Sequence, residues 1–122
     1  MKFKFVTITT DNLDESSVFY NNILEMKTIN SFSIPDGTRI SFHGYTEELV
    51  ELIEFPGPGP DKNKSNVSIC FEVDDILEME KNLISKNIKI LKGPFEVPNG
   101  DKLMFILDPN NVEIEFIQKD RK

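Results

Sequence analysis

The feature that most constrains this chain is an internal repeat. Asn12 and Asp75 are both suited to cap the start of a helix. A Pro-Asp-Gly turn at 35–37 recurs as Pro-Asn-Gly at 98–100, and the interval between the two turns equals the interval between the two caps. Such a repeat indicates two copies of one supersecondary unit. Each copy is too small to support a stable core alone, so we expect the whole chain, 1–122, to form one domain.

A Pro- and Gly-rich segment, residues 56–65, lies between the copies. Its three prolines and two glycines disfavour helix and central strand, and almost nothing in it is apolar. We therefore predict a linker at 56–65 between a first module at 1–55 and a second module at 66–122.

The bulk composition narrows the classes of partner and compartment. The chain has 14 basic and 21 acidic side chains and a net charge of −7, which argues against binding to nucleic acid or to an anionic membrane. Its one cysteine, Cys70, cannot form an internal disulfide and fits a reducing compartment. Neither a signal peptide nor an apolar run of membrane-spanning length is present. We expect a cytoplasmic protein.

Each copy has the pattern of a strand, a helix and then three strands. The strands are expected at 3–9, 27–34, 38–43 and 49–55 in the first copy, and at 66–73, 88–91, 102–107 and 112–117 in the second. The helices begin after Asn12 and Asp75, and Asn87 should end the second one in a left-handed conformation. The fold class predicted is α+β, with two βαβββ modules in tandem.

Alternation along the first strands predicts which face each helix covers. Val6 and Ile8 should lie under the first helix, whose apolar stripe includes Leu13 and Tyr20. Phe5, Thr7 and Thr9, and Ser68 and Cys70 in the second copy, should lie on the faces that no helix covers. The uncovered faces also carry apolar residues, so we expect two concave sheets to enclose a cleft, within one chain or across a dimer.

Three motifs carry a resemblance to a known family. Residues 12–20 (NLDESSVFY) look like a "DLxxSxxFY" helix, 22–26 (NILEM) like its "xVLGM" continuation, and 108–115 (DPNNVEIE) like "DPDGxxIEL". The chain thereby resembles the vicinal oxygen chelate superfamily, which includes glyoxalase I, bleomycin-resistance proteins and extradiol dioxygenases. The resemblance implies the fold and no particular activity, because this fold hosts several chemistries.

The same resemblance implies where a metal would bind. The four ligand positions of the family fall on Phe5, Glu51, Ser68 and Glu115. Phe5 has no lone pair and Ser68 has a neutral hydroxyl, so we expect no tight transition-metal site and at most a weakly held divalent cation such as Mg²⁺. The positions at which glyoxalase I holds glutathione fall on Thr9 and Phe55, neither of which can clamp a carboxylate as Arg can.

These observations give a set of candidate site residues. Glu51 and Glu115 are candidate general bases, or else solvated carboxylates at a sheet edge. His43 faces the pocket if Ile40 and Phe42 face the helix, or else lies at a rim without function. Phe3, Phe5 and Phe55 form an aromatic cage for a flat or cationic ligand, or else simply pack between sheets. The ligand pocket is predicted to comprise Phe5, Thr7, Thr9, His43, Phe55, Ser68 and Cys70, the last as a small, semi-buried residue.

Three functions remain open on the sequence. The first is a homodimeric module without cofactor that binds a small hydrophobic or cationic molecule. The second is an enzyme of the lactoylglutathione lyase type, a lyase or isomerase, which uses Glu51 and Glu115 with a weak divalent metal. The third is an interaction module whose pocket has collapsed.

Overall fold

The computed structural model describes residues 2–61 and 67–121, which fall into two compact units, one within Met1–Lys62 and the other within Asn63–Lys122. We describe each unit by itself. Residues 62–65 of the predicted linker and residue 66, the predicted start of the next strand, lie outside the described residues.

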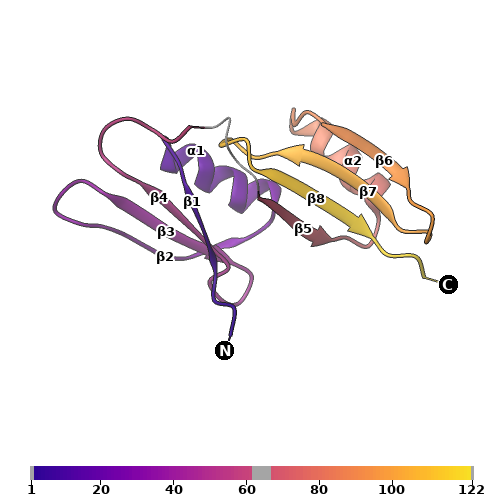
Figure 1. The fold of residues 1–122 in the computed structure, drawn as a ribbon, viewed down its shortest axis with the longest axis horizontal. Helices are drawn as coiled ribbons and strands as arrows, with labels where there is room; N and C mark the ends of the chain where they lie inside the picture. Colours follow the sequence, from indigo (N-terminus) through magenta and orange to yellow (C-terminus); the bar gives the residue numbers. More distant parts are fainter. Residues whose placement is uncertain (1, 62–66, 122) are drawn as a thin grey trace. The chain divides into compact units, whose positions relative to one another are not determined.

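Unit 1 contains a single mixed sheet and one helical segment (Figure 1). Its elements are β1 (Val6–Thr9), α1 (Leu13–Val18), the π-helix η1 (Phe19–Ile23), β2 (Lys27–Ser33), β3 (Arg39–Gly44) and β4 (Val50–Glu54). The strand order is β1-β4-β3-β2, with β1 parallel to β4 and the other pairs antiparallel.

Unit 2 repeats this arrangement. Its elements are β5 (Ser68–Glu72), α2 (Ile76–Ser85), β6 (Lys92–Glu96), β7 (Lys102–Leu107) and β8 (Glu113–Gln118). The strand order is β5-β8-β7-β6, and again only the first pair in that order is parallel. The predicted α+β class with two βαβββ modules is therefore confirmed.

The repeat extends to single hydrogen bonds at the helix starts. The N–H of Leu13 donates to Glu54 Oε1 at 2.7 Å, and the N–H of Ile76 donates to Gln118 Oε1 at 2.8 Å. In each unit, the last residue of the fourth strand thus satisfies one of the free N–H groups at the helix N-terminus. The caps are local: Asn12 accepts the N–H of Glu15, and Asp75 accepts those of Leu77 and Glu78.

The two predicted turns also share their geometry. Asp36 Oδ1 accepts the N–H of Thr38 at 2.9 Å, and Asn99 Oδ1 accepts the N–H of Asp101 at 3.0 Å. The glycine of each turn has a positive φ, +98° at Gly37 and +95° at Gly100, which a residue with a side chain rarely adopts.

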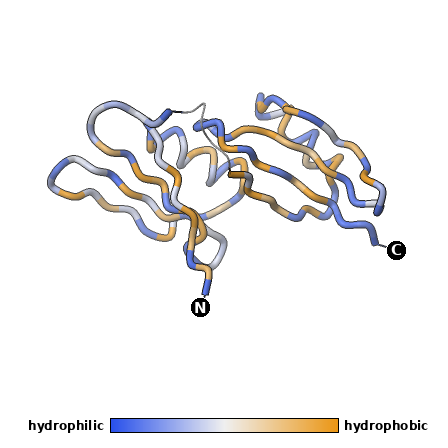
Figure 2. The backbone as a smooth tube through the Cα atoms, in the orientation of Figure 1, coloured by the Kyte–Doolittle hydropathy of each residue, from blue (hydrophilic) through white to orange (hydrophobic). Residues whose placement is uncertain are grey.

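Each helix covers one face of its own sheet. α1 contacts β3 and β4, and α2 contacts β6, β7 and β8. The residues buried between helix and sheet include Ile8, Leu13, Tyr20, Val50 and Leu52 in unit 1, and Ile76, Leu83, Met104, Ile106, Ile114 and Phe116 in unit 2. The apolar residues accordingly concentrate in the strands and helices, while the turns are hydrophilic (Figure 2).

One predicted strand is wrong. Residues 88–91 form no strand, and the third-last strand of the chain, β6, lies at 92–96 instead. Gly93 and Pro94 disfavour a central strand, but β6 is an edge strand and its pairing with β7 shifts register between Lys92 and Phe95. Edge strands and bulges are the places where a sheet accepts proline and glycine.

The helical segments of the two units differ in length. The left-handed residue after α2 is Asn87, with φ of 61°, which confirms the prediction for that position. In unit 1 the corresponding residue is Glu25, with φ of 60°. Because α1 begins at Leu13 and α2 at Ile76, the path from the helix start to the left-handed residue is one position longer in unit 1. The extra residue is accommodated in the wider turns of η1.

Candidate functional site

The uncovered face of unit 1 carries a fixed carboxylate. Thr7 on β1 lies directly opposite Glu51 on β4, and its hydroxyl donates to Glu51 Oε1 at 2.7 Å. Glu51 alternates with the buried residues Val50 and Leu52, so its side chain lies on the face away from α1. The same alternation places Thr7 and Thr9 on this face, on either side of buried Ile8.

Three phenylalanines line the same face, and we call Phe5, Phe42 and Phe32 the aromatic row. The rings of Phe5 and Phe42 meet edge to face, with centroids 5.1 Å apart and planes at 77°. Phe42 and Phe32 stack with centroids 6.4 Å apart and planes at 27°. Phe42 is also the cross-strand partner of Glu51. The carboxylate of Glu51 is therefore bordered by a hydroxyl donor on β1 and by an aromatic ring on β3.

The predicted aromatic cage does not form in unit 1. The ring partner of Phe5 is Phe42, which would have faced the helix if His43 had faced the pocket. Phe3 is 81% exposed and Phe55, which follows β4, is 52% exposed. The sequence-based list of candidate site residues did not include Phe42 and Phe32, because the residues beside them on the uncovered face come from distant parts of the chain. A comparison of residues 41–43 with the repeat at 104–106 could have revealed the position of Phe42. In that comparison Phe42 aligns with Phe105, which lies opposite Glu115.

The prediction that His43 faces the pocket is wrong. It rested on Ile40 and Phe42 facing the helix, but Phe42 lies on the uncovered face with Glu51. His43 is instead fully buried beneath the helical segment, with Nε2 2.7 Å from Ser41 Oγ and Nδ1 2.8 Å from Asn21 Oδ1. The hydrophobic pattern misled because polar residues of β3 face the helix, where they bond to one another.

The uncovered face of unit 2 carries the other predicted residues. Cys70 on β5 lies opposite Glu115 on β8, and Ser68 lies opposite Glu113. Cys70 is exposed rather than semi-buried. Partial burial raises the pKa of its thiol, and the nearby Glu115 carboxylate raises it further. The thiol therefore stays protonated at neutral pH, which does not suit a nucleophile.

Unit 2 also places a cation on this face. Glu115 is the cross-strand partner of Phe105 on β7, and the amine of Lys92 lies 4.5 Å from the centre of the Phe105 ring. The ring of Phe95 stacks on Phe105 at 6.3 Å. Both units thus place a glutamate opposite an aromatic residue, and in unit 2 the amine of Lys92 already lies over that aromatic ring.

The residues at the implied metal positions do not fit a tightly held transition metal. Phe5 offers no donor atom and its ring contacts Phe42, while an oxygen of Glu51 accepts the hydroxyl of Thr7. Within residues 2–61 and 67–121, no group of three or more His, Cys, Asp and Glu side chains is arranged to hold a metal ion. No imidazole is available for this role, because the only histidine of the chain is buried under the helix.

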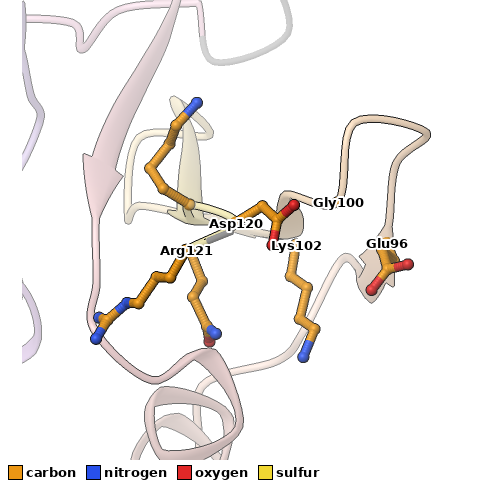
Figure 3. Close-up of a pocket in the computed structure, with 7 residues that line it drawn as sticks. Glu96, Gly100, Lys102, Asp120 and Arg121 are labelled. Atoms are coloured by element: carbon orange, nitrogen blue, oxygen red, sulfur yellow. The ribbon is translucent and has the colours of Figure 1, made fainter.

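A pocket of about 290 Å³ lies elsewhere in unit 2 (Figure 3). It is lined by Glu96, Gly100, Lys102, Gln118, Lys119, Asp120 and Arg121. Arg121 pairs with Asp74, and Lys119 donates to Asp101 at 2.8 Å. In Figure 3 the side chain of Arg121 extends away from the side of the pocket on which Glu96 lies. The charges do not converge on one point, and none of the predicted site residues lines this pocket.

Two βαβββ modules, each with its helix on one face of a mixed four-stranded sheet, define the class of fold to which this protein belongs. The chain belongs to the glyoxalase/bleomycin resistance protein/dioxygenase superfamily, whose family model matches residues 2–116.

Individual relatives match nearly the whole of this chain. A lactoylglutathione lyase of Neisseria meningitidis is 28% identical over 98% of this chain and 91% of its own length. A mitochondrial methylmalonyl-CoA epimerase of Dictyostelium discoideum is 28% identical over 99% of this chain and 78% of its own. A glyoxalase I variant from Zea mays has a TM-score of 0.84 at 24% identity over 95% of this chain. This chain covers 44% of the maize chain, less than half of its length.

The structure also bears on membrane association. In the part of the chain that is described, no helix has the length and apolar character needed to cross a bilayer.

Proposed function

We propose that this protein binds a small hydrophobic or cationic molecule without the help of a transition metal, on the face that carries Glu51 and the aromatic row. The observation that carries the proposal is the arrangement around Glu51. Its carboxylate is held by Thr7 and lies in register with Phe42, and Phe5 occupies the position from which the family supplies a metal ligand.

The chemistry of this face suits a flat cation. Aromatic rings attract a positive charge over their faces, and a carboxylate adds a charge-assisted contact. The hydrogen bond from Thr7 fixes one oxygen of Glu51, which leaves the other oxygen for a ligand. The acidic balance of the chain, −7, favours the approach of cations in the same way.

A matched pair of probes tests the proposal. 1-Methylquinolinium and quinoline share a flat bicyclic skeleton, and only the first carries a permanent charge. We expect calorimetry to show tighter binding of the cation, and Glu51→Gln to weaken that binding about fivefold, the equivalent of ~1 kcal/mol. Glu47→Gln is the control, because Glu47 lies outside this face in a loop and pairs with Lys2. Equal affinities of wild type and Glu51→Gln for the cation would refute the site.

The second candidate is a glyoxalase-type lyase or isomerase with a weakly held divalent metal. It is favoured by the relatives named lactoylglutathione lyase and methylmalonyl-CoA epimerase, each 28% identical over nearly the whole chain. In this case Glu51 and Glu115 would act as bases. Metal analysis of protein purified without chelators, with assays on the methylglyoxal–glutathione adduct in added Mg²⁺, Mn²⁺, Ni²⁺ or Zn²⁺, distinguishes the two. Turnover that Glu115→Gln abolishes would establish the enzyme.

We also propose a cytoplasmic homodimer. Support comes from the apolar residues of the uncovered sheet faces, which need a partner surface to be shielded from water. Light scattering should give about twice the chain mass of 14.0 kDa at micromolar concentration. A mass equal to a single chain at high concentration would contradict this assembly.

A further inference from the structure

A cluster of polar side chains lies beneath the helical segment of unit 1, and we call it the His43 cluster. It consists of His43 and Ser41 on β3, Ser17 on α1, Asn21 on η1 and Thr28 on β2. Ser41 Oγ and Asn21 Oδ1 are the close partners of the imidazole, at 2.7 and 2.8 Å. The hydroxyl oxygens of Ser17 and Thr28 are each 3.5 Å from a ring nitrogen.

The neighbours of the imidazole fix its tautomer. The amide nitrogen of Asn21 donates to Thr28 Oγ1 at 3.0 Å, so the Oδ1 of Asn21 is the atom directed at the ring. The Nδ1 of His43 must then carry the hydrogen, because two acceptors cannot bond to each other. This leaves Nε2 as the acceptor for the hydroxyl of Ser41. In the neutral ring Nδ1 donates to Asn21 and Nε2 accepts from Ser41, so no charge is buried.

The order Asn21, His43, Ser41 has the geometry of a base next to a nucleophile, but the cluster is closed to substrates. Ser41 is 3% exposed and His43 is 0% exposed. A carbonyl compound cannot reach the hydroxyl of Ser41 in this state. The cluster is therefore not placed to act on a bound molecule in this state.

The repeat shows that the fold does not require these polar residues. Ser41 and His43 correspond to Met104 and Ile106 of unit 2, at the same interval that separates the two turns, and both of these residues are fully buried. The pairing partners correspond as well, since His43 lies opposite Val50 and Ile106 lies opposite Ile114. An apolar pair fills this position in one unit, and a titratable pair fills it in the other.

Protonation of His43 would leave a positive charge without an anionic partner. The groups against the ring come from five elements: Ser17 from α1, Tyr20 and Asn21 from η1, Thr28 from β2, Ser41 from β3 and Val50 from β4. Among these Tyr20 is the titratable one, with its ring centre 6.5 Å away, and a phenol is neutral near pH 7. Nε2–H would also force the hydroxyl of Ser41 to turn away towards Ser17, 3.3 Å distant.

Burial lowers the pKa of His43 below its ordinary value. The unfolded chain, whose histidine is solvated, therefore binds more protons than the folded chain as the pH falls below about 6.5. The contribution of His43 to the free energy of unfolding is therefore fully present above that pH, and it is lost as the pH falls towards the pKa of the folded state.

We propose that the His43 cluster is an acid-sensitive contact that keeps the helical segment α1–η1 on the sheet of unit 1 and releases it when the imidazole is protonated. The segment bonds to β3 through Ser17 and Asn21, so a charge on the ring acts directly on its attachment. Unit 2 has Ile106 in the same place and lacks this response.

The wild-type protein provides the first test, because it has a single histidine. NMR of the imidazole and of the backbone amides is followed from about pH 7.5 to about pH 5. We expect the neutral Nδ1–H form to persist below the ordinary pKa of histidine, and the amides of 13–23 to lose protection from exchange as the ring is protonated. The amides of α2 should keep their protection. A ring that titrates like a solvated histidine, or amides of 13–23 that stay protected, would overturn the proposal.

A graft from unit 2 provides the second test. Ser41→Met with His43→Ile introduces the pair that unit 2 already buries, and water can satisfy the part-exposed Ser17 and Asn21. The urea midpoint of unit 1 in the wild type should fall by roughly 0.5 M between about pH 7.5 and about pH 5.5, and that of the graft should not change. Thr9→Val, on the opposite face of the sheet, is the control, and its urea midpoint should change with pH as that of the wild type does. An equal change of the urea midpoint with pH in the graft and in the wild type would refute the role of His43.

Discussion

The hydroxyl of Thr7 donates a 2.7 Å hydrogen bond to Glu51, its cross-strand partner. Thr7→Val removes this donor and keeps the shape of the side chain. Because Thr7 is exposed, water replaces the bond, and we expect the free energy of unfolding to change by no more than about 0.5 kcal/mol.

The same variant should affect the ligand more than the fold. Without Thr7 the carboxylate of Glu51 must be ordered when the ligand binds, so the affinity for 1-methylquinolinium should fall about threefold. Calorimetry measures this affinity, and Thr7→Ser is the control variant that keeps the hydroxyl donor. Equal binding by Thr7→Val and wild type would show that the hydroxyl does not prepare the carboxylate for a cation.

Phe42 connects the two other rings of the aromatic row. Phe42→Ala removes both ring contacts and should lower the free energy of unfolding by about 2 kcal/mol, since the side chain is half-buried. Phe3→Ala deletes the same group from a position that is 81% exposed and should have almost no effect. Urea unfolding of the two variants makes the comparison, and similar losses would contradict the described row.

The contact from the fourth strand to the helix start occurs in both units. Gln118→Ala leaves the N–H of Ile76 without its acceptor and should cost about 1 kcal/mol of stability. Glu54→Ala should cost a similar amount in unit 1. Glu54→Gln is the informative control, because unit 2 uses glutamine there and its carbonyl oxygen can still accept. If Glu54→Gln lost as much stability as Glu54→Ala, the charge of Glu54 and not its hydrogen bond would be responsible for the contribution.

Metal uptake can be restored by design. Phe5→His with Ser68→His supplies imidazoles at the two ligand positions that the family resemblance marks as empty of donors. The family resemblance implies that these positions act with Glu51 and Glu115 as one ligand set, for which Zn²⁺ distances of ~2.0–2.2 Å are required. We expect the double variant, and not the parent, to retain about one equivalent of Zn²⁺ after dialysis. Stoichiometric metal in the parent would show that its ligands lie elsewhere.

Local chemistry made much of the fold predictable. The caps at Asn12 and Asp75, the turns at 35–37 and 98–100, and the left-handed Asn87 depend on residues a few positions apart, and they appear as expected. Proline and glycine gave the wrong answer at β6, because their effect depends on whether a strand lies at a sheet edge, which its own residues do not reveal.

The candidate site was less predictable because its contacts are non-local. Glu51 and Thr7 were placed on the correct face by alternation, but the ring beside Glu51 comes from β3. The alternation of Ile40, Ser41, Phe42 and His43 suggested the opposite face. It failed because a serine and a histidine that satisfy each other can be buried as completely as an apolar pair.

The irregular edge of unit 2 has a consequence for solubility. A regular edge strand presents a row of free N–H and C=O groups on which another chain can add a strand and start to aggregate. In β6, Pro94 contributes no N–H, and the register shift between Lys92 and Phe95 interrupts the row. This border of the sheet therefore resists strand addition, although leucines and phenylalanines lie close behind it.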